Sequence, residues 1–361
     1  MTIGLVIVFI AVTGASIVFR SQLEPIVNRD LLTVPACSER VPLDTLTANA
    51  AATRPNAQLD YIRILAADDP TAARIPATMV RFTDQIFVYL NPCTGASLGQ
   101  RHRYGGVLGT IEQLHRFRFM EGGSIITATC VIVFSIVLVL GGVFLWWPAT
   151  LQGLKGSLKF NSKLPSPART LNLHKTFGFY AGLVILVSAL TGLPQAADWY
   201  RSGLYTITGS AQPPKLPKSA EPVPGARRLP METMWQRAQA IVPQPKDVLI
   251  HYPKKTRDPV DMYLIAQDAP HENARTYLNL DAYTGATLSY TPYSENSLGH
   301  KLYFLTLSWH SGHLGGVAGQ LILLFGALSV PALAYTGIAS YLRRRARSRA
   351  AAIPGSVGSY T

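Results

Sequence analysis

Charged residues are scarce in this sequence. Of its 361 residues only 15% are charged, whereas 48% are hydrophobic. A soluble domain carries about a quarter charged residues, so the shortfall argues against a wholly soluble protein and predicts segments that face lipid. Acidic residues are the rarer kind, with 20 Asp and Glu against 33 Lys and Arg, which gives a formal net charge of +13.

Several motifs of common enzymes are also missing. No G-x-G-x-x-G follows a strand-like run, and no Walker-type loop is present; the glycines at 105–109 lack that context. The chain therefore has no evident nicotinamide or flavin site of its own. The sequence also lacks HExxH, which excludes a zincin-type protease, and we find no Ser-His-Asp set or carboxylate pair that favours hydrolysis.

Cysteine is limited to three residues, whose spacing does not match a metal site. Cys130 lies inside an apolar run, where a small packing role is expected. Cys37 and Cys93 both fall in the first polar region. They could form a disulfide if that region is in an oxidising compartment.

Four apolar stretches are long enough to cross a bilayer, which needs roughly 20 residues. They are residues 3–19, 124–147, 177–194 and 314–341. The first is the weakest, and a cleaved signal peptide is the alternative interpretation of it. A basic segment before Ile3, which a signal peptide would carry, is missing from the sequence as given.

Basic residues set the expected orientation. The loop after the second stretch and the tail after the fourth carry nine basic residues and no acidic one: Lys155, Lys159, Lys163, Arg169, Arg343, Arg344, Arg345, Arg347 and Arg349. Both segments, and hence both termini, should be cytoplasmic, and they explain most of the net charge without nucleic acid. The expected segments are helix 1–22, outer domain 23–112, helix 113–148, loop 149–172, helix 173–195, outer domain 196–300, helix 301–342 and tail 343–361.

The two outer regions contain matching segments, residues 87–98 and 277–288. Each has alternating apolar residues around an Asn/Asp-x-x-Thr-Gly turn, which predicts a β-hairpin. Helical patterns at 43–52 and 231–242 precede them, and the pair Thr13-Gly14 recurs as Thr191-Gly192. We therefore expect a membrane α-helical fold with four transmembrane helices in a duplicated helix–domain–helix arrangement and two extracytoplasmic α+β domains. The alternative is a coincidence of one short turn motif.

Two histidines stand at equivalent places in the halves. Gly142 follows His115 by 27 residues, and Gly337 follows His310 by 27. If each helix is continuous, both imidazoles lie at one depth and can clasp a haem between them as axial ligands. His313, one turn from His310, is the alternative ligand or a polar contact to a cofactor edge.

His174 heads the third helix on the cytoplasmic side. Its equivalent in the first half would lie upstream of Met1, which suggests that the sequence begins inside its first helix. An inner haem would then have only His174 from this chain. Alternatively the inner site is lost and His174 caps a helix near the lipid headgroups.

Five motifs resemble those of the PepSY-associated transmembrane family of bacterial inner-membrane proteins. They are Leu114-His115-Arg116, Leu145-Trp146-Trp147-Pro148, Leu173-His174-Lys175, Trp309-His310-Ser311-Gly312 before Gly315-Gly316, and the Thr-Gly turn of each PepSY-like domain. The resemblance implies a ferric-siderophore reductase with one or two b-type haems. Such a protein passes electrons from a cytoplasmic donor (reduced flavin, a reductase or quinol) across the lipid bilayer. The missing histidine-containing start departs from this pattern and puts the inner haem in doubt.

A basic cluster, together with aromatic residues beside the paired histidines, would complete such a site. Arg101, His102, Arg103, Arg116 and Arg118 would pair with haem propionates or an anionic ligand, or else snorkel at the interface. Trp309 and Tyr104 would line the site or belong to the aromatic belt. Two rivals remain. A non-enzymatic PepSY-type regulator or binding protein would be colourless, and a transporter would need polar or broken helices at the midplane.

Overall fold

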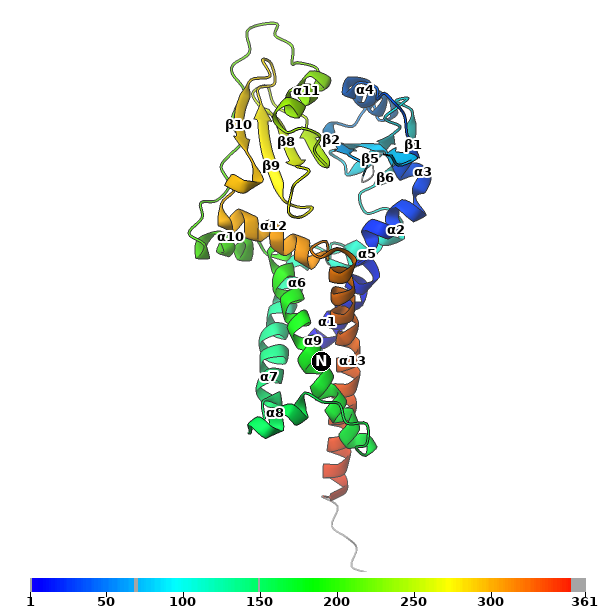
Figure 1. Ribbon diagram of the computed structural model, residues 1–361, viewed down its shortest axis with the longest axis vertical. Helices are drawn as coiled ribbons and strands as arrows, with labels where there is room; N and C mark the ends of the chain where they lie inside the picture. Colours follow the sequence, from blue (N-terminus) through cyan, green and yellow to red (C-terminus); the bar gives the residue numbers. More distant parts are fainter. Residues whose placement is uncertain (1, 68–70, 149, 352–361) are drawn as a thin grey trace, which may run out of the picture. The chain divides into compact units, whose positions relative to one another are not determined.

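The computed structural model describes residues 2–67, 71–148 and 150–351. The chain divides into two compact units (Figure 1). The helical unit contains residues 1–18, 111–197 and 309–361, and the sheet unit contains residues 19–110 and 198–308. Residue 149 of the expected basic loop and residues 352–361 of the expected basic tail lie outside the described residues.

The helical unit is built from long apolar helices. Its elements are α1 (Thr2–Ile17), α6 (Gly123–Val133), a π-helix (Phe134–Leu140), α7 (Gly141–Trp146), α8 (Leu151–Ser157), α9 (Ser166–Ala196) and α13 (Gly316–Ala351). Of the described residues, three helical stretches could cross a membrane, namely Gly123–Trp146, Ser166–Ala196 and Gly316–Arg349. The number rises to four if the bent pair of α1 and α2 (Arg20–Val27) is counted as one span.

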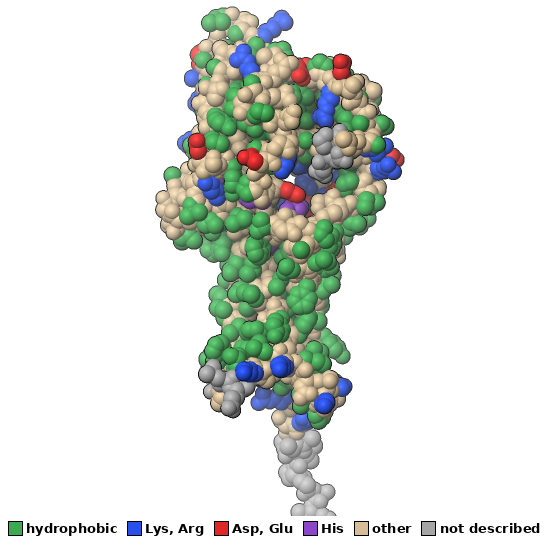
Figure 2. All heavy atoms as spheres, viewed as in Figure 1, with side chains coloured by type: hydrophobic (Ala, Val, Ile, Leu, Met, Phe, Trp, Pro, Cys, Tyr) green, Lys and Arg blue, Asp and Glu red, His purple; other side chains and the backbone are tan. Residues whose placement is uncertain are grey.

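On the face shown in Figure 2, apolar side chains cover most of the helical unit. Phe144 is 82% exposed and Leu183 is 69% exposed. Such exposure is unfavourable in water and favourable in lipid. Inside, Cys130 is buried and unbonded, as expected of a packing residue, and contributes to a small core with Ile7 and Ala181. The surface therefore fits a lipid-facing bundle.

Helix α9 extends beyond the apolar stretch 177–194. It begins at Ser166, after Pro165 at the N-cap and with a proline in the first turn, a position where the ring is tolerated. The expected loop 149–172 therefore contains α8 and the start of α9. His174 lies inside α9 rather than at its beginning.

The sheet unit contains one eight-stranded antiparallel sheet. In sheet order its strands are β10 (Thr287–Thr291), β9 (Arg275–Leu280), β8 (Val260–Ile265), β7 (Asp247–His251), β2 (Leu59–Leu65), β4 (Thr78–Phe82), β5 (Ile86–Leu90) and β6 (Ser97–His102). Each outer region contributes four of these strands, and β2 pairs with β7. The two regions are thus joined in one sheet instead of forming two separate domains. A two-stranded sheet pairs β1 (Thr33–Pro35) with β3 (Arg74–Pro76).

Both expected hairpins are present, as β5–β6 and β9–β10. Their turns use the same side-chain contacts. The Asn91 amide oxygen accepts from the backbone N–H of Cys93 and Thr94, and one Asp281 carboxylate oxygen accepts from those of Tyr283 and Thr284. An Asx residue that closes its own turn in this way explains the recurrence of Asn/Asp at this position.

A disulfide joins the first hairpin to the segment that follows β1. Cys37 and Cys93 are bonded, with Cα atoms 6.0 Å apart. Cys93 lies in the β5–β6 turn, so the bond closes a loop of the sheet unit onto that turn. The sequence predicted this disulfide only for an oxidising compartment, and the structure contains it.

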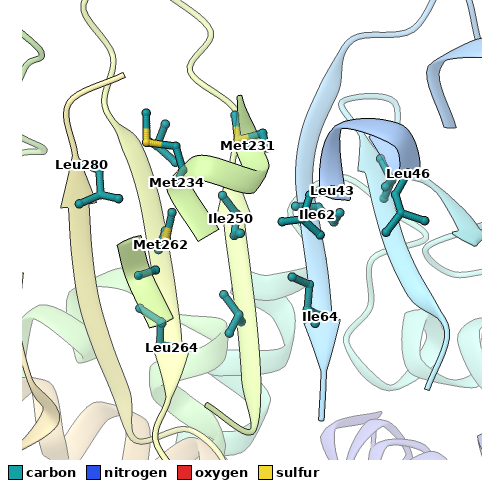
Figure 3. Close-up of a cluster of buried hydrophobic side chains, with 14 of the residues drawn as sticks. Leu43, Leu46, Ile62, Ile64, Met231, Met234, Ile250, Met262, Leu264 and Leu280 are labelled. Carbon is teal, nitrogen blue, oxygen red and sulfur yellow. The ribbon is translucent and has the colours of Figure 1, made fainter. Parts of the chain in front are cut away.

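Helices α4 (Leu43–Thr53) and α11 (Met231–Ile241) pack on one face of the sheet (Figure 3). The alternating burial of β2 and β7 points Ile62, Ile64 and Ile250 to that face. Side chains from both halves, including Leu46 and Met234, form a single buried cluster. The period of two in the strands therefore creates one shared core.

The two helices cap each other across the halves. Each has a proline at its N-cap, Pro42 or Pro230, which has no side-chain oxygen to offer. The Asp44 carboxylate accepts from the backbone N–H of Met231 and Glu232, at 2.9 and 3.0 Å. The Glu232 carboxylate accepts in return from the Leu43 N–H at 2.9 Å. Each acid thus satisfies donors and opposes the dipole of the partner helix.

Removing one of these carboxylates should increase fraying of the first turn of the opposite helix. Because a cap is worth about 1 kcal/mol, Asp44→Ala should speed amide hydrogen exchange in the first turn of α11 about fivefold. Glu232→Ala should do so in the first turn of α4. Hydrogen-exchange mass spectrometry measures both. Glu39→Ala, at an exposed position, is the control, and loosening confined to the mutated helix itself would contradict reciprocal capping.

Candidate metal centre

The first imidazole of the site lies at the C-terminal end of α5 (Gly106–His115). His115 Nδ1 is 2.9 Å from the Ile10 carbonyl oxygen and 3.3 Å from the Thr13 hydroxyl, both on α1. The Thr13 hydroxyl itself donates to the Phe9 and Ile10 carbonyls. A Cβ at Gly14 would lie 3.0 Å from His115 Cε1, so the missing side chain makes room for the ring.

The second imidazole lies at the C-terminal end of α12 (Leu298–His310) and has the same surroundings on α9. His310 Nδ1 is 3.0 Å from the Ser188 carbonyl oxygen. The Thr191 hydroxyl donates to that same carbonyl at 3.2 Å. A Cβ at Gly192 would lie 2.7 Å from His310 Cε1. We call each such set of threonine, following glycine and preceding carbonyl a histidine seat.

The two imidazole rings lie close together within the helical unit. The centroids of His115 and His310 are 6.2 Å apart, and their planes differ by 30°. Two metal–imidazole bonds of about 2 Å, plus about 1 Å from each nitrogen to its ring centre, would give a separation of about 6 Å. Because Nδ1 of each ring bonds a carbonyl, Nε2 is the nitrogen left for a metal. The pair is therefore a candidate for two ligands of one metal ion.

Burial keeps both imidazoles neutral. It lowers the pKa of His115, and it lowers the pKa of His310 to about 4, where the proximity of His115 adds to the effect. A neutral imidazole offers the lone pair that a metal needs. The structure therefore presents both rings in the ligand form at neutral pH.

The described residues contain no group of three or more His, Cys, Asp or Glu side chains arranged to hold a metal ion. A structural zinc site needs four such ligands. Haem iron takes only two axial ligands from the protein. Two imidazoles thus match the number of ligands that haem iron takes from a protein.

A third histidine seat holds His174. Its Nδ1 lies 2.9 Å from the Thr336 hydroxyl on α13, which donates in turn to the Ala332 and Leu333 carbonyls. A Cβ at Gly337 would lie 3.3 Å from His174 Cε1. Three histidines thus use one local design.

The helices that carry His115 and His310 are not continuous with the spans. His115 ends α5, and α6 begins at Gly123; His310 ends α12, and α13 begins at Gly316. The premise of continuous helices is therefore wrong. Glycines in the left-handed region, Gly122 and Gly315 among them, allow the chain to turn at both breaks.

The other expected site residues are divided between the units. In the helical unit, Arg116 pairs with Glu112 at 3.3 Å, Trp309 is 44% exposed, and His313 contacts the Ser311 hydroxyl at 3.0 Å. Arg118 also belongs to this unit.

Three members of the expected basic cluster, Arg101, His102 and Arg103, lie in the sheet unit together with Tyr104. Arg101 forms an ion pair with Glu24 and stacks over Tyr89. Arg103 stacks over Tyr104, whose backbone N–H donates to His102 Nδ1. The charge of Arg101 is thus already balanced.

Sequence reasoning missed the function of the seats. Thr13-Gly14 and Thr191-Gly192 were informative only as signs of duplication, and Thr336 was not singled out. The signal was present, because a Thr-Gly pair occurs on the helix opposite each of the three histidines. Sequence alone could not indicate that the glycines face imidazoles.

Comparison with known proteins agrees with this architecture. The profile of the PepSY-associated TM region matches residues 1–344. No curated protein matches the chain. The chain belongs to the family of proteins with a PepSY-associated transmembrane region.

Filling one seat should disturb its histidine. Gly192→Ala places a Cβ 2.7 Å from His310 Cε1, and such overpacking costs about 1–3 kcal/mol. We expect a lower thermal midpoint than in Gly182→Ala, on the same helix, where a Cβ meets nothing within 4 Å. Adding His310→Ala to Gly192→Ala should recover part of the loss, and equal midpoints for the two single variants would contradict the seat.

Proposed function

We propose that this protein is a haem-containing reductase of the bacterial inner membrane. It passes electrons across the membrane to a ferric siderophore on the periplasmic side and so releases Fe(II) for uptake. The observation that carries the proposal is the 6.2 Å separation of the His115 and His310 rings, each held by a carbonyl at Nδ1. Family membership alone does not assign an activity.

His115 and His310 would hold the outer haem through Nε2. When bound, the haem supplies one-electron chemistry between Fe(III) and Fe(II). The residues of the chain keep the imidazoles neutral, fix their tautomer through Ile10 and Ser188, and set their spacing through the glycines. Arg116 and Trp309, which adjoin the two histidines in the sequence, are candidates for contacts to the cofactor edge, with His313 as the alternative.

His174 would serve a second, inner haem. Its seat on Thr336-Gly337 resembles the other two, which favours a ligand role over a capping role. The electron donor would act on this side, as reduced flavin, a reductase or quinol. The described residues that contact His174 do not include a second axial ligand for this haem.

The periplasmic location of the sheet unit rests on two features. Nine basic residues lie in the segment after α7 and in the last part of the chain, which favours a cytoplasmic location for those segments. The Cys37–Cys93 disulfide favours an oxidising compartment for the sheet unit. Together they favour cytoplasmic termini.

A siderophore suits this chemistry because its hard oxygen donors hold Fe(III) more tightly than Fe(II). Reduction therefore weakens the complex and releases the metal. Arg103, His102, Tyr104 and Arg118 remain candidates for substrate contact. Arg101 is a weaker one, since Glu24 neutralises it.

The spectrum of the purified protein tests the cofactor. Protein from haem-replete cells should show a reduced-minus-oxidised b-type spectrum. His115→Ala and His310→Ala should remove the outer haem, whereas His313→Ala should retain it. A colourless wild-type protein would instead support a non-enzymatic PepSY-type regulator or binding protein.

Reduction of substrate is tested separately. Chemically reduced protein in nanodiscs, mixed with a ferric siderophore and a ferrous-specific chelator, should yield Fe(II). His310→Ala, which should lose the outer haem, should lower Fe(II) production to near the background measured without protein. A normal haem spectrum without Fe(II) production would leave the cofactor assignment standing and refute the siderophore as acceptor.

A further inference from the structure

Each half of the chain has a short helix that begins directly after an apolar helix. Helix α2 starts at Arg20, three residues after α1 ends, and α10 (Asp198–Ile207) starts two residues after α9 ends. Arg20 follows Gly14 by six residues, and Asp198 follows Gly192 by six. The two short helices are therefore equivalents in the duplicated sequence.

Helix α2 is held to the sheet unit on one side. Glu24 bonds Arg20 within the helix and Arg101 on β6. On another face Leu23, Ile26 and Val27 are exposed by 41%, 73% and 71%. These three residues are spaced as i, i+3 and i+4, so they form one apolar stripe.

Helix α10 repeats this arrangement with different residues. Tyr205 is buried, and its hydroxyl lies 3.0 Å from His300 Nδ1 on α12. Trp199 and Ile207 are exposed by 64% and 78%. This helix too has one face packed in the sheet unit and a separate apolar face without cover from the described residues.

We propose that α2 and α10 lie in the membrane–water interface, with these apolar faces in the headgroup–acyl boundary. The two links contain two residues and one residue and reach at most about 10 Å, so both helices must begin near the ends of the helices they follow. Charged Arg20 and Glu24 exclude the hydrocarbon core for α2. Trp199 and Tyr200 are residue types enriched at the interface.

Such helices bind by burying an apolar face while the polar face stays in water. The sheet unit would then be tied to the bilayer surface at two points, one for each half of the duplicated chain. The proposal uses no property of the histidine site. It therefore stands or falls independently of the haem.

Nitroxide labels on matched positions test it. In a Cys130→Ala background, which leaves only the bonded Cys37–Cys93 pair, single cysteines are placed at Ile26 and Ile207. Controls are placed five residues earlier, at Ser21 and Ser202, both exposed and about 140° away around the helix. The full-length protein is studied in nanodiscs of phosphatidylethanolamine and phosphatidylglycerol.

The collision rate of each nitroxide with oxygen, which partitions into lipid, is compared with its collision rate with a water-soluble nickel chelate. The oxygen-to-nickel ratio should be several-fold higher at Ile26 and Ile207 than at Ser21 and Ser202. Equal ratios within each pair would overturn the proposal. Exclusion of both reagents at Ile26 and Ile207 would also overturn it, because a protein partner or a second copy would then cover the helices.

Discussion

The close approach of an imidazole to a Thr-Gly pair on a neighbouring helix is the contact on which the helical unit depends. An ordinary side chain in place of the glycine would overlap the ring, as the 2.7 Å distance at Gly192 shows. The threonine before the glycine donates a hydrogen bond to a backbone carbonyl of its own helix, and the imidazole contacts that same carbonyl. A buried histidine is costly unless its polar atoms are satisfied, and this seat satisfies Nδ1 while leaving Nε2 available.

The sheet unit solves a different problem in a comparable way. A four-stranded half alone would expose both of its outer strands, and exposed edges invite unwanted pairing. Pairing β2 with β7 removes one edge from each half. The same junction brings α4 and α11 close enough for Asp44 and Glu232 to cap each other's helices. Two kinds of contact therefore join the halves: the backbone hydrogen bonds between β2 and β7, and the carboxylates that cap the opposite helices.

Local patterns predicted local structure well, and longer-range features poorly. The span at 124–147 and both hairpins follow from apolar periodicity and turn chemistry, which act over a few residues. The breaks after His115 and His310 did not follow, because glycine can continue or end a helix. Nor did the joined sheet, since strand patterns do not specify which edge meets which. His115 and His310 were found because each precedes a glycine by the same 27 residues. The contacts of their rings with the Thr-Gly pairs are visible only in three dimensions.

The helix breaks bear on the proposed reaction. His115 and His310 are each the last residue of a short helix. The membrane spans that follow begin later, at Gly123 and Gly316. Had the helices been continuous, the rings would have belonged to the spans themselves. Under the proposed function, a ligand pair placed before both spans would lie toward the membrane surface, where a water-soluble ferric chelate would approach. His174, by contrast, lies inside the long helix α9, eight residues after its start. Under the proposed function, this difference suits an outer site that meets substrate and an inner site that accepts electrons.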